Sequence, residues 1–284
     1  MLRSLTILLS LIFILSVKTG NAQNSLLWEI SGNGLEKPSY IFGTIHLIAQ
    51  NDFVVRKEID SVFDLSEQVA FEIKLDDPSL LATLQEWIYL PAGKTIKDFC
   101  TEEEYQKLKK YFLDSLETDI ETLKDQKPFV LTQLQIADYV TGESASFEIY
   151  FFNKCMSTYV PIYGLEKLQD QLNIFDSIPY EEQMDMVINS ANNISYYKAS
   201  WASLIKAYKE EDINKLNQIS MEVSPELIKY DDIFLDERNS RWIPVIESLV
   251  KTKSTFIAVG AAHLGGETGV LQLLKNRGYT LKQL

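Results

Sequence analysis

The sequence predicts an α/β protein with a central, mostly parallel sheet built from two similar halves, each a strand followed by Gly-x-x-His. Near the start of the chain, the apolar strand 39–42 runs directly into residues 43–46, Gly-Thr-Ile-His. Near the end, the apolar strand 254–259 runs into residues 260–263, Gly-Ala-Ala-His. Between them, residues 78–220 carry leucine, glutamine, tyrosine and acidic residues at helical spacing. We therefore expect a large helical insertion that covers the edge of the sheet carrying both motifs.

The first half of the sheet is predicted from three strands and one helix. A half-buried strand over 26–31 is followed by the turn residues Asn33-Gly34. The second strand, 39–42, leads into the first motif, and amphipathic spacing predicts a helix over 55–65. A third strand is predicted over 68–73. Strand, helix and strand in this order form a βαβ unit, which implies parallel strands.

The middle region is expected to be mainly helical, with prolines as breaks. The spacing of its apolar residues predicts helices over 102–116, 131–141 and 180–210. One short strand is predicted over 158–163, and it leads into Gly164-Leu165-Glu166. This region is therefore predicted to form a helical layer between two halves of a sheet domain.

The α/β pattern returns at the C-terminal end of the chain. A helix is predicted over 236–249, before the buried strand 254–259, and another over 268–276, after the second motif. Gly278 has the position of a C-cap, and 279–281 is a final strand. A histidine at the carboxyl end of a parallel strand points into the crevice where open α/β sheets bind ligands.

Composition and charge exclude two classes of protein. Hydrophobic residues make up 46% of the 284 residues, which is enough for a sizeable core and excludes wholesale disorder. Lysine and arginine total 27 against 40 aspartate and glutamate, which gives a net charge of −13. A chain this acidic, without a long basic run, is a poor ligand for phosphate backbones, so we expect no nucleic-acid partner.

The N-terminus is typical of a secretory signal peptide over residues 1–22. Arg3 supplies a positive charge, 5–17 is an apolar run, and Gly20-Asn21-Ala22 offers small residues for cleavage. The run is shorter than the roughly 20 residues of a membrane span, and no cysteine stands at the cleavage point for lipidation. An uncleaved anchor is the alternative. We expect an exported protein, periplasmic or extracellular, with residues 23–284 as one domain and no stable membrane anchor.

Export bears on the two cysteines, Cys100 and Cys155. In an oxidising compartment a lone pair of cysteines tends to form a disulfide, and we predict one here. The alternative is two separately buried thiols. Neither cysteine has a histidine nearby in sequence that would favour a nucleophile.

The candidate site rests on the histidines. The chain has two, His46 and His263, and each occupies the same strand-Gly-x-x-His setting. A single motif of this kind is expected by chance, and two separately buried histidines bonded to backbone carbonyls would be the simpler interpretation. A matched pair that accounts for every histidine instead favours one shared site.

A carboxylate is needed to complete such a site, and Glu72 is the best candidate. Neutral imidazole is the commonest metal ligand in proteins, and two imidazoles need one or two carboxylates beside them. Glu72 lies on the strand 68–73, where a carboxylate is costly unless it is paired, liganded or at the strand end. The alternative is a glutamate already in solvent, because charged residues follow it. Glu166 and residues 237–239 (Glu-Arg-Asn) are further candidates, although by themselves they fit a turn and a solvated helix start.

The chain resembles the TraB/GumN family of secreted bacterial proteins, which is related to the Tiki metalloproteases and more distantly to erythromycin-esterase-like hydrolases. The matching segments are 37–46 (KPSYIFGTIH), 71–72 (FE), 164–166 (GLE), 237–242 (ERNSRW) and 256–264 (FIAVGAAHL). Their order spans the chain from about residue 25 to 284. The tandem Gly-x-x-His pair is the most specific of these elements.

The resemblance implies metal-dependent peptidase activity and assigns roles to residues of this sequence. It implies His46, Glu72 and His263 as the metal and catalytic core, holding Zn, Mn or Co, and it makes Glu166, Arg238 and Asn239 site-lining candidates. Metal-activated water would attack a peptide carbonyl, a glutamate would act as general base and Arg238 would stabilise the oxyanion. Which glutamate ligates and which is the base stays open. Lys167 stands where the family usually has threonine, so the role of Glu166 is less certain.

Two other functions remain open from the sequence. A non-catalytic protein that sequesters an extracellular peptide is the first, because members of the TraB branch are associated with restraining peptide pheromone signals. An esterase-like hydrolase is the second. In each peptide-directed case the partner is a peptide or protein, and the oligomeric state is left open.

Overall fold

The computed structural model describes residues 25–223 and 229–284. The predicted signal peptide, residues 1–22, lies outside the described part of the chain, so it stays a prediction. Within the described part, no helix has the length and apolar character needed to cross a membrane.

The centre of the protein is a six-stranded sheet with the order β6-β4-β7-β2-β1-β8. Strands β6, β4, β7 and β2 run parallel, and β1 pairs antiparallel with both β2 and β8. The prediction of a mostly parallel α/β sheet is confirmed. The strands are β1 (Leu27–Gly32), β2 (Ser39–Thr44), β4 (Gln68–Ile73), β6 (Ile162–Glu166), β7 (Thr255–Gly260) and β8 (Tyr279–Gln283).

The two motif strands are neighbours in this sheet. β2 and β7 pair in parallel with Thr44 opposite Gly260, so both motifs leave the same edge side by side. The predicted βαβ unit is present as β2, α1 (Lys57–Leu65) and β4, but β7 lies between its two strands. Strand β7, from the C-terminal part of the chain, therefore lies between strands that come from the N-terminal part.

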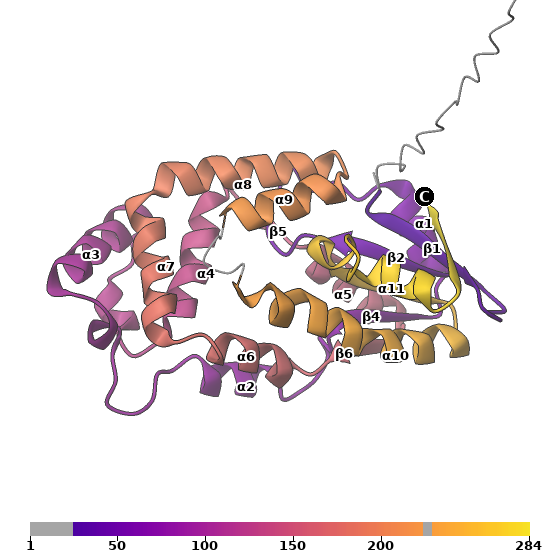
Figure 1. Cartoon of the computed structure of the whole chain (residues 1–284), viewed down its shortest axis with the longest axis horizontal. Coiled ribbons are helices and arrows are strands. Elements are labelled where there is room, and N and C mark those ends of the chain that lie inside the picture. The colour runs from indigo at the N-terminus through magenta and orange to yellow at the C-terminus, as the bar shows by residue number, and fades with distance from the viewer. Residues whose placement is uncertain (1–24, 224–228) are drawn as a thin grey trace, which may run out of the picture.

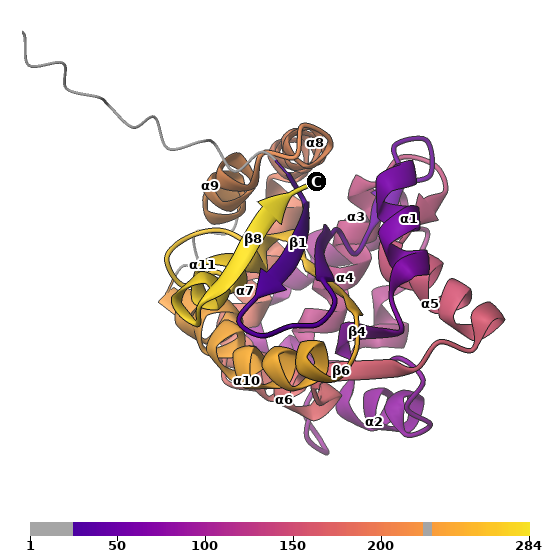
Figure 2. The ribbon, with the colours of Figure 1, turned by 90° about the vertical axis from the view of Figure 1, so that its right-hand side faces the viewer.

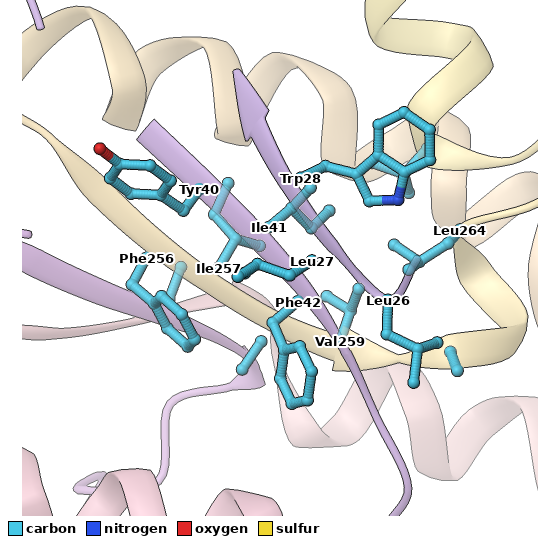
Figure 3. Close-up of a cluster of buried hydrophobic side chains, with 14 of the residues drawn as sticks. Leu26, Leu27, Trp28, Tyr40, Ile41, Phe42, Phe256, Ile257, Val259 and Leu264 are labelled. Atoms are coloured by element: carbon cyan, nitrogen blue, oxygen red, sulfur yellow. The ribbon is translucent and has the colours of Figure 1, made fainter. Parts of the chain in front are cut away.

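Aromatic and aliphatic side chains fill the core on both faces of the sheet (Figure 3). Phe42 of β2 and Phe256 of β7 are buried with their rings 6.4 Å apart. Helices α1 and α5 (Phe147–Thr158) cover one face, and α10 (Glu237–Thr252) and α11 (Val270–Asn276) cover the other (Figure 2). Phe151 of α5 stacks on Phe63 of α1 with ring centroids 5.3 Å apart.

Most of the remaining helices form a second cluster beside the sheet (Figure 1). Its own buried core includes Tyr105, Phe112, Leu131 and Met184. The N-terminus of α3 is fixed by a capping box between Thr101 and Glu104, which satisfies two helix-end N–H groups. The helices α8 (Ile194–Lys209) and α9 (Ile213–Val223) instead contribute buried residues such as Tyr208 and Ile213 to the core of the sheet. The other helices are α2 (Leu80–Trp87), α3 (Glu102–Leu116), α4 (Pro128–Tyr139), α6 (Leu168–Asp176) and α7 (Tyr180–Asn192).

Two element predictions in the middle region are wrong in detail. The single helix predicted over 180–210 is two helices, because the chain leaves helical geometry at Asn193. The strand predicted over 158–163 begins only at Ile162, because α5 runs on to Thr158 and Tyr159 ends it in the left-handed conformation. Residues 78–220 are mainly helical as predicted, but they also supply the edge strand β6 and the face-covering helix α5.

The predicted disulfide is wrong in this structure, which has both cysteines as free thiols. Cys155 on α5 is buried against the sheet, whereas Cys100 packs on the helical cluster. The two thiols therefore belong to different cores. Burial is the largest cause that raises the pKa of each thiol, which makes both poor nucleophiles at neutral pH.

Candidate functional site

The two histidines meet at one carboxylate. His46 follows β2, His263 ends the short helix η5 (Ala261–His263) and Glu72 lies near the end of β4. The Nε2 atoms of His46 and His263 lie 4.0 and 3.9 Å from Oε1 of Glu72. Two ligand atoms with bonds of about 2.0–2.2 Å to one ion can be at most about 4.3 Å apart. Each histidine and Glu72 are thus within the span of a single metal ion.

The two motif glycines serve different purposes in this arrangement. A Cβ on Gly43 would come within 2.7 Å of Leu264 Cδ1 and 3.1 Å of Ala261 Cα, so glycine there lets the two motif turns pack together. A Cβ on Gly260 would lie 3.2 Å from Glu72 Oε1 and 3.7 Å from His46 Nε2. Glycine at 260 therefore keeps open the space between the carboxylate and the imidazoles.

Each imidazole is held through Nδ1 by an oxygen acceptor. Nδ1 of His46 lies 2.9 Å from Oε1 of Glu148, and Nδ1 of His263 lies 2.7 Å from Oδ1 of Asn239. The Asn239 amide orientation follows from its Nδ2, which donates to the carbonyl of Thr268 at 3.0 Å. Because both acceptors need a hydrogen on Nδ1, a neutral ring keeps its lone pair on Nε2. In their neutral forms both rings therefore offer the Nε2 lone pair to a ligand.

Arg238 is the buried cation that links the two site glutamates. Its Nη2 donates to Oε2 of Glu72 and to Oε1 of Glu166, each at 2.6 Å, and its Nε donates to Oε1 of Glu166 at 2.9 Å. Nη1 lies 3.2 Å from Nε2 of His263. The guanidinium also lies over the Trp242 ring at 4.8 Å, a cation–π contact from the same helix. Arg238 thus joins β4, β6 and α10 at one point.

The two sides of the site differ in their exposure to solvent. The side chains of Glu72 and Glu166 are 11% and 4% exposed, and Arg238 and Asn239 are buried. The alternatives of a solvated strand end for Glu72 and a solvated helix start for Arg238 and Asn239 are therefore wrong, whereas Glu237 is exposed. The His46 side chain is 67% exposed, so solvent reaches the site from that side.

The surroundings set different protonation states for the three central groups. Burial raises the pKa of Glu72, but its interactions with the two imidazoles and the Arg238 guanidinium outweigh burial and lower the pKa to about 2. Burial lowers the pKa of His263 to about 3, against the attraction of Glu72. Loss of solvation lowers the pKa of His46, but the Glu148 hydrogen bond and the Glu72 charge raise it to about 9. His263 is neutral at pH 7, and His46 carries a proton.

The donor set fits a divalent ion. Two imidazole Nε2 atoms and one ionised carboxylate face each other. Arg238 pairs with Glu72 and Glu166, whereas Glu148 pairs with His46. Within 25–223 and 229–284, no three ligand side chains already stand in coordinating geometry. The guanidinium of Arg238 lies against the Nε2 lone pair of His263, with Nη1 3.2 Å away. Ligation at His263 requires that contact to open.

Two residues of the site were missed from the sequence. Glu148 binds His46, and Gln171 Nε2 donates to Glu72 Oε2 and Glu166 Oε1, each at 3.0 Å. Ser146, the N-cap of α5, and a glutamate two residues later are an ordinary helix start, which hides Glu148. Gln171 lies on α6 five residues beyond Glu166, where helical spacing gives no functional signal.

The fold and the site define an α/β protein whose polar centre combines two Gly-x-x-His turns with a buried glutamate–arginine network. The TraB/PrgY/gumN family model matches residues 26–283, and the chain belongs to that family.

Curated relatives are similar over most of this chain. Metalloprotease TIKI1 of Danio rerio is 22% identical, over 91% of this chain and 63% of its own length. Metalloprotease TIKI homolog of Amphimedon queenslandica is 24% identical, over 92% and 62%, and metalloprotease TIKI1 of Homo sapiens is 24% identical, over 91% and 62%. This chain therefore spans about three fifths of the length of these relatives. The comparison with solved structures gives no significant match.

Proposed function

We propose that the protein is an exported, metal-dependent hydrolase that cleaves peptides, with His46, Glu72 and His263 as ligands of a divalent ion such as Zn, Mn or Co. The observation that carries this proposal is the convergence of two Nε2 atoms, within 4.0 Å, on one carboxylate oxygen. The names of the curated relatives support the same class. The predicted signal peptide supports export, which would place the peptide or protein substrate in the periplasm or outside the cell.

The bound ion would supply an activated water and polarise the scissile carbonyl. The chain's own residues would orient these partners. Glu72 Oε1 receives the Gly260 N–H at 2.8 Å, which fixes the carboxylate between the imidazoles and favours it as the ligand. Glu166 is held by Arg238, and its second oxygen, Oε2, is buried without a hydrogen bond, 3.9 Å from Arg241 Nη2. That oxygen has no hydrogen bond to give up, which favours Glu166 as the proton-accepting base.

Arg238 would stabilise negative charge that develops on the substrate. Its guanidinium is buried, always charged and already aligned by two carboxylates. Exchange of its contact with His263 Nε2 for a substrate oxygen would leave the bonds to both glutamates in place. Asn239 would keep His263 in the orientation that ligation needs.

The test is metal content and peptide turnover of the purified protein, with and without a chelator. We expect His46→Ala and His263→Ala each to abolish both, because no third histidine can substitute. Gln50→Ala, an exposed change in the segment that follows His46, is the matched control and should leave both intact. Glu72→Gln should lose metal if Glu72 is a ligand, and Glu166→Gln should keep metal but lose turnover if Glu166 is the base.

Contrary outcomes have clear meanings. Full metal content and turnover in both histidine variants would move the site elsewhere. Metal binding without cleavage across a broad peptide panel would favour the peptide-sequestering function. Ester cleavage without peptide cleavage would favour the esterase-like hydrolase.

A further inference from the structure

Glu148 has no role in the proposed reaction, yet three side chains are hydrogen-bonded to its carboxylate. It lies in the first turn of α5, and its side chain is 17% exposed. Oε1 accepts from Thr44 Oγ1 at 2.5 Å and from His46 Nδ1 at 2.9 Å, and Oε2 accepts from Ser146 Oγ at 2.8 Å. Glu148 is therefore an acceptor with a fixed position.

The backbone brings Glu148 to His46 through a small second sheet. Strand β3 (Ile48–Ala49) pairs antiparallel with β5 (Ser144–Ala145), Ile48 opposite Ala145. His46 lies two residues before β3, and Glu148 lies three residues after β5. Thr44 ends β2, so its bond to Glu148 also ties this pair to the central sheet.

The two imidazoles differ in how they are held. His263 is buried, and its ring lies 4.4 Å from that of Trp242, so packing restricts it in addition to Asn239. The His46 side chain is 67% exposed, so packing covers only a minor part of its ring. Its orientation therefore depends on the one strong bond at Nδ1, which Glu148 accepts.

We propose that Glu148 is a positioning residue that fixes the Nδ1–H form and the orientation of His46, so that Nε2 faces Glu72. Carboxylates that hold the second nitrogen of a metal-binding histidine raise its basicity and fix its direction, and their loss typically costs 10–100-fold in metal affinity. The expected loss of metal affinity rests on the proposed function. The Nδ1–H form and the orientation of His46 in the metal-free protein do not depend on it.

The first experiment measures the ring directly, by ¹⁵N NMR of His46 in metal-free protein at pH 10, where the imidazole is neutral. We expect the Nδ1–H form in the wild type and a shift toward the Nε2–H form in Glu148→Ala. Glu148→Gln keeps an acceptor oxygen and should lie between them. Glu143→Gln, an exposed glutamate five residues earlier, is the matched control and should resemble the wild type. A wild-type ring in the Nε2–H form would overturn the proposal.

The second experiment measures zinc affinity. Glu148→Ala should weaken zinc binding about 10–100-fold while circular dichroism and the unfolding midpoint stay near the wild type. Glu148→Gln should lose less, because it keeps an acceptor oxygen, and Glu143→Gln should bind zinc as the wild type does. No loss in either variant of Glu148, or an equal loss in Glu143→Gln, would overturn the positioning role. A wild type that binds none of Zn, Mn and Co, with His46 in the Nδ1–H form, would refute the proposed function and leave the positioning of the ring intact.

Discussion

The backbone N–H of Gly260 donates a hydrogen bond of 2.8 Å to Oε1 of Glu72, which joins the second Gly-x-x-His turn to the glutamate of the neighbouring strand. The same oxygen faces both imidazoles. Residue 260 is therefore part of the wall of the site, and any side chain there would project into the space between the three candidate ligands.

We predict that Gly260→Ala weakens metal binding more than it weakens the fold. The added Cβ would lie 3.2 Å from Glu72 Oε1 and 3.6 Å from His263 Cδ2, and these side chains can shift by a few tenths of an ångström. The shift would disturb the ligand positions. Metal affinity by calorimetry should fall by at least about tenfold, while the free energy of unfolding falls by roughly 1 kcal/mol.

Gly43→Ala is the comparison, because its Cβ would approach the backbone of Ala261 at 3.1 Å as well as Leu264. Backbone does not yield as a side chain does, so overpacking there should cost about 1–3 kcal/mol of stability. Equal effects of the two variants on stability and on metal affinity would contradict this division between the glycines.

The second prediction concerns protons released on metal binding. At pH 7 His46 carries a proton, because its pKa is about 9, whereas His263, with a pKa of about 3, is neutral. Ligation must expel the His46 proton, so about one proton should leave per ion, and apparent affinity should rise about tenfold per pH unit up to about pH 9. Calorimetry in buffers of different ionisation enthalpy measures this. An unperturbed histidine would instead give constant affinity above about pH 6.5.

The third prediction concerns the stability of the metal-free protein against pH. The pKa of His46 is raised, so its contribution is full below about pH 6.5, the unfolded value, and is lost as the pH rises through about 9. The lowered pKa of His263 acts in the opposite direction, since its contribution is present above about 6.5 and is lost as the pH falls toward 3. Urea unfolding from pH 6 to 10 should show a decline that His46→Gln removes. A decline of the same size in that variant would point to other groups.

The pairing of the motif histidines was predictable, whereas their supporting residues were not. Each histidine follows a buried strand and the same Gly-x-x-His turn, and parallel strands bring such turns to one edge. The insertion of β7 between β2 and β4 is long-range pairing that local patterns do not encode. Glu148 escaped notice because its helix-start pattern has a sufficient local explanation in the Ser146 N-cap.

Similar reasons explain the errors in the middle region. Asn193 breaks a helical pattern without a proline or glycine, so periodicity alone continues through it. The sequence contains a single pair of cysteines, which suggested a disulfide. Their separation into different cores depends on how the helical cluster packs against the sheet. Sequence pattern indicates which residues are buried, and tertiary packing decides which buried residues meet.

The fourth prediction concerns Arg238. Arg238→Gln leaves the buried carboxylates of Glu72 and Glu166 without their cation, which should cost about 3 kcal/mol of stability at neutral pH. Arg238→Lys keeps the charge but not the forked geometry, so it should lie between the wild type and Arg238→Gln. A divalent ion should raise the melting temperature of Arg238→Gln more than that of the wild type, because it replaces the missing charge. An equal metal-induced increase in both proteins would mean that the ion binds away from these carboxylates.

The last prediction lies in the helical cluster, away from the histidines. Lys127, just before α4, is buried with its Nζ 2.5 Å from Asp176 Oδ1 and 4.3 Å from the centre of the Trp87 ring. Trp87 Nε1 donates to the other oxygen of Asp176 at 3.0 Å, so one aspartate joins the ends of α2, α4 and α6. Asp176→Ala leaves the buried ammonium of Lys127 without its carboxylate and should lower the free energy of unfolding by about 2 kcal/mol. Adding Lys127→Met should restore part of that loss, because the unpaired charge is then removed.

Glu86→Ala, an exposed change beside Trp87, is the control and should stay within about 0.5 kcal/mol of the wild type. Urea unfolding measures all three variants. A loss in Asp176→Ala that the second substitution deepens would show that the ammonium is well solvated and that the cluster is held by packing.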